Sequence, residues 1–451
     1  MPDVEKPPEL NDENVIKRRE LLYRLMISQL FYDGHQNIAV SLTSAVQPDP
    51  PCPPSDRLFN LVSEGLKYEK EMQPKKDSRT GLYQDTLLGP GLDLEFDTDI
   101  QTNAPEPALY VTAYVTSHKA PCRACAFSND GQLIATGSAD TSIKILDVDR
   151  MVAKAYDERA ATTQQKENYE THPVIRTLYD HLDEVTCLEF HPKEAILVSG
   201  SRDNTVKLFD YSKSSVKKAY KVLQVPTSAL PKVSNLSDAE QVKCMSLHPT
   251  GDYLVVGTNH FVVRVYDLTT AQCYVCNFPS HQHTKALTSV RYSNDGRQYV
   301  TASRDGSIKV WDGVSNRCVN TFQKAHDGSD VCSVEFSRNS KYILSSGKDS
   351  LVKLWELTTS RCLIAYTGAG TTGKQEHRAQ AVFNHTEDYV MFPDEATTSL
   401  CAWNARNASR RQLLSLGHNG PVRMIMHSPT GPAFVSCSDD HRARFWQRRT
   451  K

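Results

Sequence analysis

Four short stretches of the chain, TSIKILD (141–147), NTVKLFD (204–210), GSIKVWD (306–312) and SLVKLWE (350–356), are versions of one another. In each stretch, β-branched or other large apolar residues alternate with polar ones, which is the period of a half-buried strand. Each stretch ends on a large apolar or aromatic residue followed by a carboxylate. The chain therefore repeats one strand-rich unit, and the period of that repeat decides the fold.

The four tryptophans mark this period. Trp311, Trp355, Trp403 and Trp446 are separated by 44, 48 and 43 residues, close to the spacing of about 40–45 residues of a propeller blade. Further copies end at residues 146–147, 209–210 and 266–267, which brings the number of repeats to seven. We therefore predict an all-β, seven-bladed propeller over residues 108–451, preceded by a small all-α module.

Three of the repeats share a fuller set of polar residues. Each has a His, a Ser or Thr four residues before an Asp, and a Trp six residues after that Asp. The sets are His283, Thr301, Asp305 and Trp311; His326, Ser345, Asp349 and Trp355; and His418, Ser436, Asp440 and Trp446. This pattern resembles WD-repeat propellers, and the resemblance implies a buried hydrogen-bonded chain in each blade, which stiffens the blade when every member is satisfied.

A nucleophilic triad is the alternative interpretation of Ser, His and Asp occurring together. The set recurs several times at blade spacing, whereas an enzyme needs one active site. We therefore expect these residues to be structural, and we predict no catalytic residue and no enzymatic activity.

Closure of the ring is expected to use a strand from ahead of the first repeat. Residues 108–116 (ALYVTAYVT) alternate in the manner of a strand and directly precede His118, so we expect them to complete the last blade and remove a free sheet edge. The first two intervals between repeat ends are 63 and 57 residues long. These excesses predict insertions at about 148–179 and 211–240, and their polar composition places them outside the core.

A helical pattern occupies residues 12–67. We expect helices over 12–32 and 37–46 and a third that follows Ser55. The first helix carries Leu22, Leu25, Met26 and Leu30, and a unit of this size buries too little surface to cover all of its own apolar residues. We therefore predict homodimerisation through these side chains, with packing on the propeller as the alternative.

Charge is balanced overall, with 52 Lys and Arg against 53 Asp and Glu, but it is distributed unevenly. The expected linker, 68–107, holds six acidic and no basic residues between positions 85 and 106. Residues 405–451 carry a net charge of +7 and include Arg442, Arg444, Arg448 and Arg449. Three interpretations remain open for these basic residues: an electrostatic strap from the linker, a site for RNA or an acidic partner, or a solvated face.

Other signals exclude functions. Cys122-x-x-Cys125 and Cys273-x-x-Cys276 have zinc-like spacing, but the pairs lie about 150 residues apart. We also expect Cys122 and Cys125 on a strand, where a three-residue offset directs side chains to opposite faces. We predict neither a metal nor a cofactor. Phosphate-loop motifs are absent from the sequence, and so are apolar runs long enough for a membrane span.

The sequence between the repeated His, Asp and Trp residues resembles one family, the fifty-kilodalton subunits of cleavage stimulation factor. The resemblance is carried by GLDLEFDTDIQT (91–102), HPVIRTLYDHLDEVTCLEFHP (172–192), WDGVSNRC (311–318), SKYILSSGKDS (340–350), FNHTEDYV (383–390) and CSDDHRARFW (437–446). It implies a nuclear, non-catalytic scaffold in pre-mRNA 3′-end cleavage and polyadenylation. It also implies a homodimer formed by the N-terminal helices.

The same resemblance implies partners. The propeller would bind the seventy-seven-kilodalton scaffold subunit and through it reach the subunit whose RNA-recognition domain reads GU-rich pre-mRNA. The C-terminal domain of RNA polymerase II is a further candidate partner, and no membrane is involved. The chain departs from the family in the length of the 211–240 insertion, which puts contacts from that edge in doubt. The alternative function is a WD-repeat substrate adaptor of a ubiquitin ligase, which also joins an N-terminal helical module to a propeller.

Overall fold

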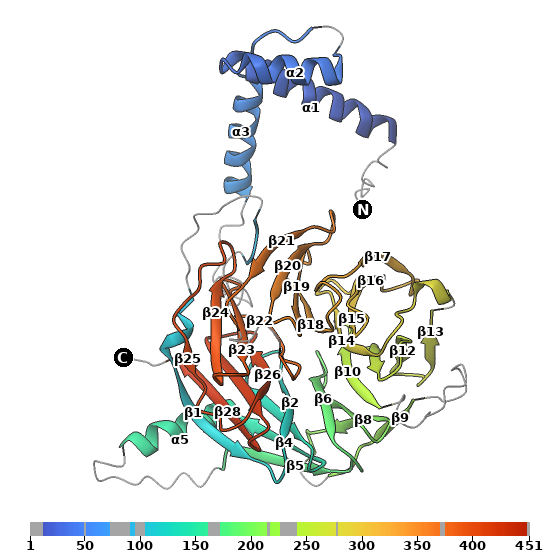
Figure 1. Ribbon diagram of the computed structural model, residues 1–451, viewed down its shortest axis with the longest axis vertical. Helices are drawn as coiled ribbons and strands as arrows, with labels where there is room; N and C mark the ends of the chain where they lie inside the picture. The colour runs from blue at the N-terminus through green and yellow to red at the C-terminus, as the bar shows by residue number, and fades with distance from the viewer. Residues whose placement is uncertain are drawn as a thin grey trace, which may run out of the picture. The chain divides into compact units, whose positions relative to one another are not determined.

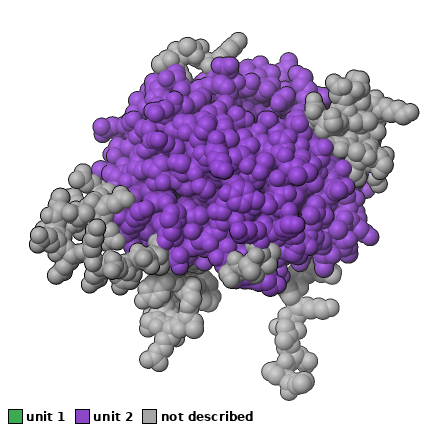
Figure 2. All heavy atoms as spheres, turned by 90° about the horizontal axis from the view of Figure 1, so that it is seen from below, with its two compact units in different colours: residues 1–82 green, residues 83–451 purple. Residues whose placement is uncertain are grey.

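Two units make up the chain, residues 1–82 and residues 83–451, and Figure 2 shows one face of the second unit in purple. A computed structural model describes residues 12–48, 51–72, 91–94, 104–160, 172–213, 217–225, 241–276, 278–369 and 375–448. Within these ranges, no helix combines the length and the apolarity that crossing a bilayer requires.

The first unit contains three helices: α1 (Asp12–Tyr32), α2 (Gln36–Val46) and α3 (Arg57–Met72). Ile27 of α1 and Ala39 of α2 are fully buried where the helices pack together. The Ser55 hydroxyl accepts a hydrogen bond from the Arg57 amide at 3.2 Å and so caps the start of α3. This helix continues five residues beyond the expected end of the module at 67, because the residues that follow include Glu, Lys and Met, which favour helices.

The second unit consists of seven four-stranded antiparallel sheets among its described residues. Figure 1 shows them arranged around a common centre, with β2, β6, β10, β14, β18, β22 and β26 innermost. The all-β, seven-bladed propeller predicted from the repeat is therefore the observed architecture.

The strands have the following bounds. The first blade comprises β2 (Cys122–Phe127), β3 (Leu133–Ser138), β4 (Ser142–Asp147) and β5 (Val174–Tyr179), and the second comprises β6 (Val185–Phe190), β7 (Ile196–Ser201), β8 (Thr205–Asp210) and β9 (Lys221–Gln224). The third comprises β10 (Val242–Leu247), β11 (Tyr253–Thr258), β12 (Arg264–Asp267) and β13 (Cys273–Val275), and the fourth comprises β14 (Leu287–Tyr292), β15 (Gln298–Ser303), β16 (Ile308–Asp312) and β17 (Cys318–Phe322). The fifth comprises β18 (Val331–Phe336), β19 (Tyr342–Gly347), β20 (Val352–Glu356) and β21 (Cys362–Tyr366), and the sixth comprises β22 (Val382–Phe383), β23 (Tyr389–Asp394), β24 (Ser399–Asn404) and β25 (Leu414–Ser415). The seventh comprises β26 (Val422–His427), β27 (Ala433–Ser438), β28 (Arg442–Arg448) and β1 (Tyr110–Ser117).

The last blade joins the two ends of the propeller sequence. Strand β1 pairs antiparallel with β28, from Tyr110 opposite Arg448 to Ser117 opposite Arg442. The expected closing segment, 108–116, thus corresponds to a strand that lies at the outer edge of the blade formed by β26, β27 and β28. Because the first and last strands share one sheet, separating the ends of the propeller requires breaking this ladder.

A β-bulge recurs at the start of the innermost strand in six of the seven blades. In β2 the pairing register shifts between Cys122 and Ala124, and in β10 it shifts between Val242 and Cys244. The residue left between the two paired positions is therefore Arg123 in one blade and Lys243 in the other. A bulge redirects the side chain of its extra residue, so the same rim position is set apart in blade after blade.

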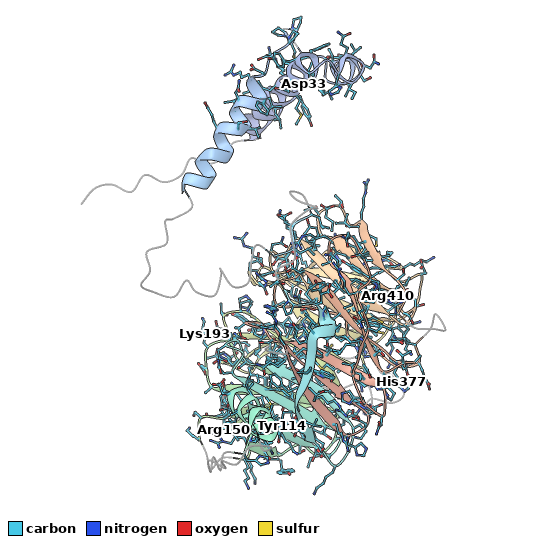
Figure 3. All side chains as sticks on the ribbon, turned by 90° about the vertical axis from the view of Figure 1, so that its left-hand side faces the viewer. Asp33, Tyr114, Arg150, Lys193, His377 and Arg410 are labelled. Carbon is cyan, nitrogen blue, oxygen red and sulfur yellow. The ribbon has the colours of Figure 1, made fainter. Side chains whose placement is uncertain are left out.

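The prediction that the first insertion, 148–179, lies outside the core is partly wrong. Its residues include β5, the outermost strand of the first blade, and a helix, α5 (Val148–Ala160). Met151 of this helix is buried in an apolar cluster, and the Lys154 ammonium lies 5.4 Å from the centre of the Tyr114 ring on β1. Figure 3 shows Tyr114 and Arg150 where α5 covers this strand. Val148, Met151 and Val152 are spaced as one face of a helix, and that spacing is why the segment packs rather than extends into solvent.

The expected second insertion, 211–240, also contains an outermost strand, β9. Each of the two long intervals runs from the end of one third strand to the end of the next. It therefore includes the fourth strand of the earlier blade, β5 or β9. Residues 214–216 and 226–240 of this insertion lie outside the described residues.

Candidate functional site

The three complete sets of polar residues are hydrogen-bonded in the structure. His283 Nδ1 lies 3.0 Å from Asp305, its Nε2 lies 2.7 Å from the Thr301 hydroxyl, and Trp311 Nε1 donates to that hydroxyl at 2.8 Å. The corresponding distances are 3.0, 2.8 and 2.8 Å in the set of His326, Ser345, Asp349 and Trp355, and 2.9, 2.8 and 2.9 Å in the set of His418, Ser436, Asp440 and Trp446.

The second blade contains the same chain of hydrogen bonds without the Trp, with His181 bonded to Asp203 at 2.8 Å and to Ser199 at 2.6 Å. In the first blade, His118 bonds to Thr136 at 3.0 Å but reaches Asp140 through the Ser142 hydroxyl. Ser199 and Thr136 were not singled out from the sequence. Each lies four residues before its Asp, so the spacing rule that identified the other three sets could have found them.

These hydroxyls are inaccessible. Thr301, Ser345 and Ser436 are each 0% exposed, so no substrate reaches them. Burial lowers the pKa of His283, although Asp305 opposes this shift. Burial disfavours the ionised form of Asp305, but hydrogen bonds from His283 and Ser307 hold the pKa of this carboxyl well below its ordinary value. In this blade, the neutral His283 imidazole is fixed between the Asp305 carboxylate and the Thr301 hydroxyl. These hydrogen bonds hold the loop before β14 against β15 and β16.

Another buried His, His427, lies at the end of the innermost strands that is opposite the polar sets. His427 stacks on His385 with ring centres 5.2 Å apart, and its Nε2 lies 3.4 Å from the Tyr110 hydroxyl. The two His side chains line a cavity of about 460 Å³ at this end of the innermost strands. Burial, and then the charge of His385, lowers the pKa of His427 to about 3.

This lowered pKa predicts acid sensitivity. Below about pH 6.5 the unfolded chain takes up a proton at His427, but the folded chain does so only near pH 3, so the free energy of unfolding falls as the pH falls. Between pH 8 and pH 5, this one group lowers the free energy of unfolding by about 2 kcal/mol. Urea titrations at both pH values should show a pH-dependent loss that is smaller by this amount in His427→Phe. An equal loss in the two proteins would contradict the assignment.

The prediction for Cys122 and Cys125 is wrong. Both side chains lie in one buried cluster with Cys437, and hydrogen bonds from Cys122 and then Cys125 raise the pKa of the Cys437 thiol. The bulge between Cys122 and Ala124 adds a residue to the alternation, so a three-residue offset returns to the same face. Cys273 lies in a different blade, so the two zinc-like pairs do not meet.

One group of three side chains in the described residues has the proximity of metal ligands: Glu376, His377 and Glu395. His377 Nδ1 is hydrogen-bonded to Glu395, so its lone pair or proton is already engaged. Figure 3 shows His377 at the edge of the propeller. A surface carboxylate–imidazole pair of this kind is a common hydrogen-bonded contact and does not by itself assign a metal.

The basic segment 405–451 does not form one patch. Arg406 is buried and bonds to Asp388 at 2.9 Å, and Arg423 is paired with Asp439. Arg442 and Arg448 are exposed on β28, whereas Arg444 is half-buried and donates to the Gly417 carbonyl at 2.6 Å. Arg449 lies outside the described residues.

The described linker residues contact two basic residues of the segment 405–451, because Arg406 donates to the Gly91 carbonyl at 2.9 Å and Arg411 pairs with Glu106. Leu92 is buried in a cluster with Tyr342 and Phe392, and its amide donates to Glu387 at 2.9 Å. Asp93 lies 3.3 Å from Lys341, and Glu106 lies 3.5 Å from Arg411. The described part of the linker therefore lies against the fifth and sixth blades, and burial of Leu92 contributes to that contact together with charge.

The helical module leaves the predicted apolar residues at its surface. Leu22 is 42% exposed and Met26 is 38% exposed, while Leu25 and Leu30 are half-buried. Exposed large apolar residues on α2 and α3 add to this surface, among them Ile38, Val40, Phe59 and Val62. So many exposed large apolar residues on so small a unit mark it as a site of protein association.

Comparison with known proteins decides between the families that share this architecture. Residues 14–70 match the sequence model of the cleavage stimulation factor subunit 1 dimerisation domain. The chain is 35% identical over 445 residues to cleavage stimulation factor subunit 50 of Arabidopsis thaliana, and the alignment covers 97% of each protein. The chain belongs to the cleavage stimulation factor subunit 50 family.

Other similarities of this subunit 50 family member reflect its propeller. Residues 110–147 and 410–447 match the WD domain, G-beta repeat, and residues 175–355 match the nucleolar protein 10-like N-terminal domain. Pre-mRNA-processing factor 19 of Oryza sativa subsp. japonica is 28% identical over half of the chain and 37% of its own length. Nuclear distribution protein nudF of Aspergillus niger is 24% identical over 69% of the chain and 71% of its own length.

Proposed function

We propose that this chain is a non-catalytic scaffold subunit of cleavage stimulation factor and acts in the nucleus in pre-mRNA 3′-end cleavage and polyadenylation. The observation that carries the proposal is the 35% identity to subunit 50 over 97% of both chains, helices and propeller included. The WD-repeat set supports a non-catalytic role, because its Ser and Thr hydroxyls are buried and serve the blade.

Two separate surfaces would divide the work. The α1 residues Leu22, Leu25, Met26 and Leu30 would join two copies of the chain, and the propeller would bind the seventy-seven-kilodalton subunit. Two linked copies would hold two RNA-reading subunits near one GU-rich element, so that release of one reader is followed by rapid rebinding. By linking two copies, this subunit would double a weak contact between the complex and RNA.

The exposed Arg442 and Arg448 on β28 support a docking face for an acidic partner segment or for RNA, with the C-terminal domain of RNA polymerase II as a further candidate partner. Both side chains are exposed and make no ion pair among the described residues, whereas Arg406, Arg411 and Arg423 of the same segment are paired with carboxylates.

Purification from nuclear extract tests this function. The tagged full chain, treated with ribonuclease to remove RNA bridges, should recover the other subunits of cleavage stimulation factor, identified by mass spectrometry. Recovery of cullin-type ligase subunits in their place would support the substrate-adaptor alternative and contradict the proposal. A preparation with neither set of partners would contradict both.

A further inference from the structure

At the end of the innermost strands opposite His427, the charged residues that line the cavity are almost all basic. A cavity of about 310 Å³ lies there, and its lining includes seven basic side chains and one carboxylate, that of Glu184. Six of the basic residues lie at the rim: Arg123, Arg202, Lys243, Arg304, Arg378 and Arg423. They come from five different blades and from the segment that enters the sixth, so they surround the cavity rather than follow one strand.

The repeat itself places these charges. Arg123, Lys243 and Arg423 are the extra residues of the bulges in β2, β10 and β26. Arg202 and Arg304 follow the ends of β7 and β15, next to the bulge positions of their blades, because Val185 pairs with Ser201 and Leu287 pairs with Ser303. One register, repeated around the axis, thus directs cations from many blades to a single point.

The two halves of this ring differ in how their charge is neutralised. Glu184 bonds to Arg123 at 3.0 Å and to Arg202 at 2.8 Å, and Asp439 bonds to Arg123 and Arg423. Among the described residues, Lys243, Arg304 and Arg378 have no carboxylate within ion-pair distance. Three cations therefore face one half of the cavity without an ion-pair partner among the described residues.

Buried polar atoms in the same cavity also lack partners. The Thr288 hydroxyl, on a side chain more than nine-tenths buried, accepts or donates no hydrogen bond, and neither Arg378 Nη2 nor Arg202 Nε has an acceptor among the described residues. Thr288 is itself the bulge residue of β14. Unsatisfied buried groups of this kind cost stability, and a ligand that satisfies them recovers it.

Repulsion among the charges of the ring also favours the binding of an anion. Burial, and then the charges of Arg202, Arg378 and Arg304, lowers the pKa of Lys243 to about 8, against the opposing effect of Glu184. Burial and the Arg304 charge also lower the pKa of Arg378, and Cys332, Cys244 and Asp330 offset them only in part. Gathering like charges in a partly buried space is unfavourable for the free protein and favourable once an anion enters.

We propose that this ring is a binding site for a compact, multiply charged phosphate-class anion, held by Lys243, Arg304 and Arg378 and by the Thr288 hydroxyl. The site is independent of the assembly role proposed above. The circular arrangement selects the shape of the ligand, because a compact anion on the axis contacts cations from several blades at once. A chain polyanion such as RNA or an acidic peptide would be met better by a linear track of charge.

Calorimetric titration of the purified full chain with myo-inositol hexakisphosphate and with tripolyphosphate tests the site. We expect both probes to bind and to raise the melting temperature. Affinity should fall at least tenfold in the variant Lys243→Gln/Arg304→Gln/Arg378→Gln. It should also fall as the pH rises above about 8, where Lys243 loses its proton. The matched control is Lys193→Gln/Arg297→Gln/Arg361→Gln, which removes the same charge from exposed positions outside the cavity and should keep the affinity of the parent protein.

Three results would overturn the proposal. The first is that neither probe binds. The second is that both triple variants lose affinity equally, which would reduce the effect to overall charge. The third is that an RNA oligonucleotide or a polyglutamate peptide binds through the three cations while the compact probes do not. Because the ring variant removes mutual repulsion, it should melt no lower than the parent protein in the absence of the probes. A lower melting temperature would show that the three cations serve folding rather than binding.

Discussion

Replacing Trp355 by Ala is expected to lower the free energy of unfolding by roughly 3–5 kcal/mol, the range for large truncations in a packed core. The indole N–H donates to Ser345 at 2.8 Å, and the ring packs edge-on against Phe322 with centres 5.5 Å apart. Ala removes both contacts and leaves the buried Ser345 hydroxyl with one partner fewer. Urea unfolding of the full chain, followed by fluorescence and by circular dichroism, measures the change.

The chain supplies the control for this substitution. The second blade has Phe209 at the equivalent position, buried beside His181 and Ser199. Trp355→Phe should therefore cost less than Trp355→Ala, since it keeps most of the packing and loses the hydrogen bond, which contributes about 1 kcal/mol. A Trp355→Ala protein as stable as the parent would show that the tetrad does not support its blade.

The propeller could be predicted from the sequence because its evidence is local and repeated. The spacing of Trp311, Trp355 and Trp446, the His and Asp before them and the alternation of the strands all lie within single repeats. The segment ahead of His118 could be placed for the same reason, since a ring of such repeats leaves one strand position to fill.

Departures from regular alternation could not be predicted in this way. The bulge in β2 brings Cys122 and Cys125 to one face and sets Arg123 apart, but nothing in CRACAF distinguishes a bulged strand from a regular one. Helix α5 could not be predicted with the same ease, because its many polar residues are typical of a solvated loop and only Val148, Met151 and Val152 mark its apolar face.

The basic ring was missed for a different reason. Arg123, Lys243 and Arg423 lie more than a hundred residues apart from one another in the sequence, and only the circular fold brings them to one rim. A signal existed, because each is the second residue of the innermost strand of its repeat. Comparing the seven repeats position by position, rather than by their landmarks alone, would have shown it.

The largest expected effect outside the propeller is on the state of association. Burying Leu22 and Met26 against a second copy contributes roughly 1.5–3 kcal/mol for each side chain, and a carboxylate in their place would be buried without a counter-charge. Both residues are substantially exposed within one chain, so the module itself tolerates the change. We expect Leu22→Asp/Met26→Asp to dissociate the dimer and leave each propeller folded.

A conservative exchange at the same positions provides the control. Leu22→Met/Met26→Leu keeps the apolar volume and adds no charge, and swaps of this kind usually cost under about 1.5 kcal/mol. It should remain associated, with the circular dichroism spectrum of the parent chain. Dissociation of this variant as well would show that detailed fit, rather than apolar burial, holds the copies together.

The joining of two copies through α1 is tested most directly by the mass of the purified full chain in solution, measured by light scattering behind a sizing column. The parent chain should have twice the 50.5 kDa of a single polypeptide, and Leu22→Asp/Met26→Asp should have half the mass of the parent at the same concentration. A parent chain of 50.5 kDa, or an Asp variant that keeps the doubled mass, would contradict it.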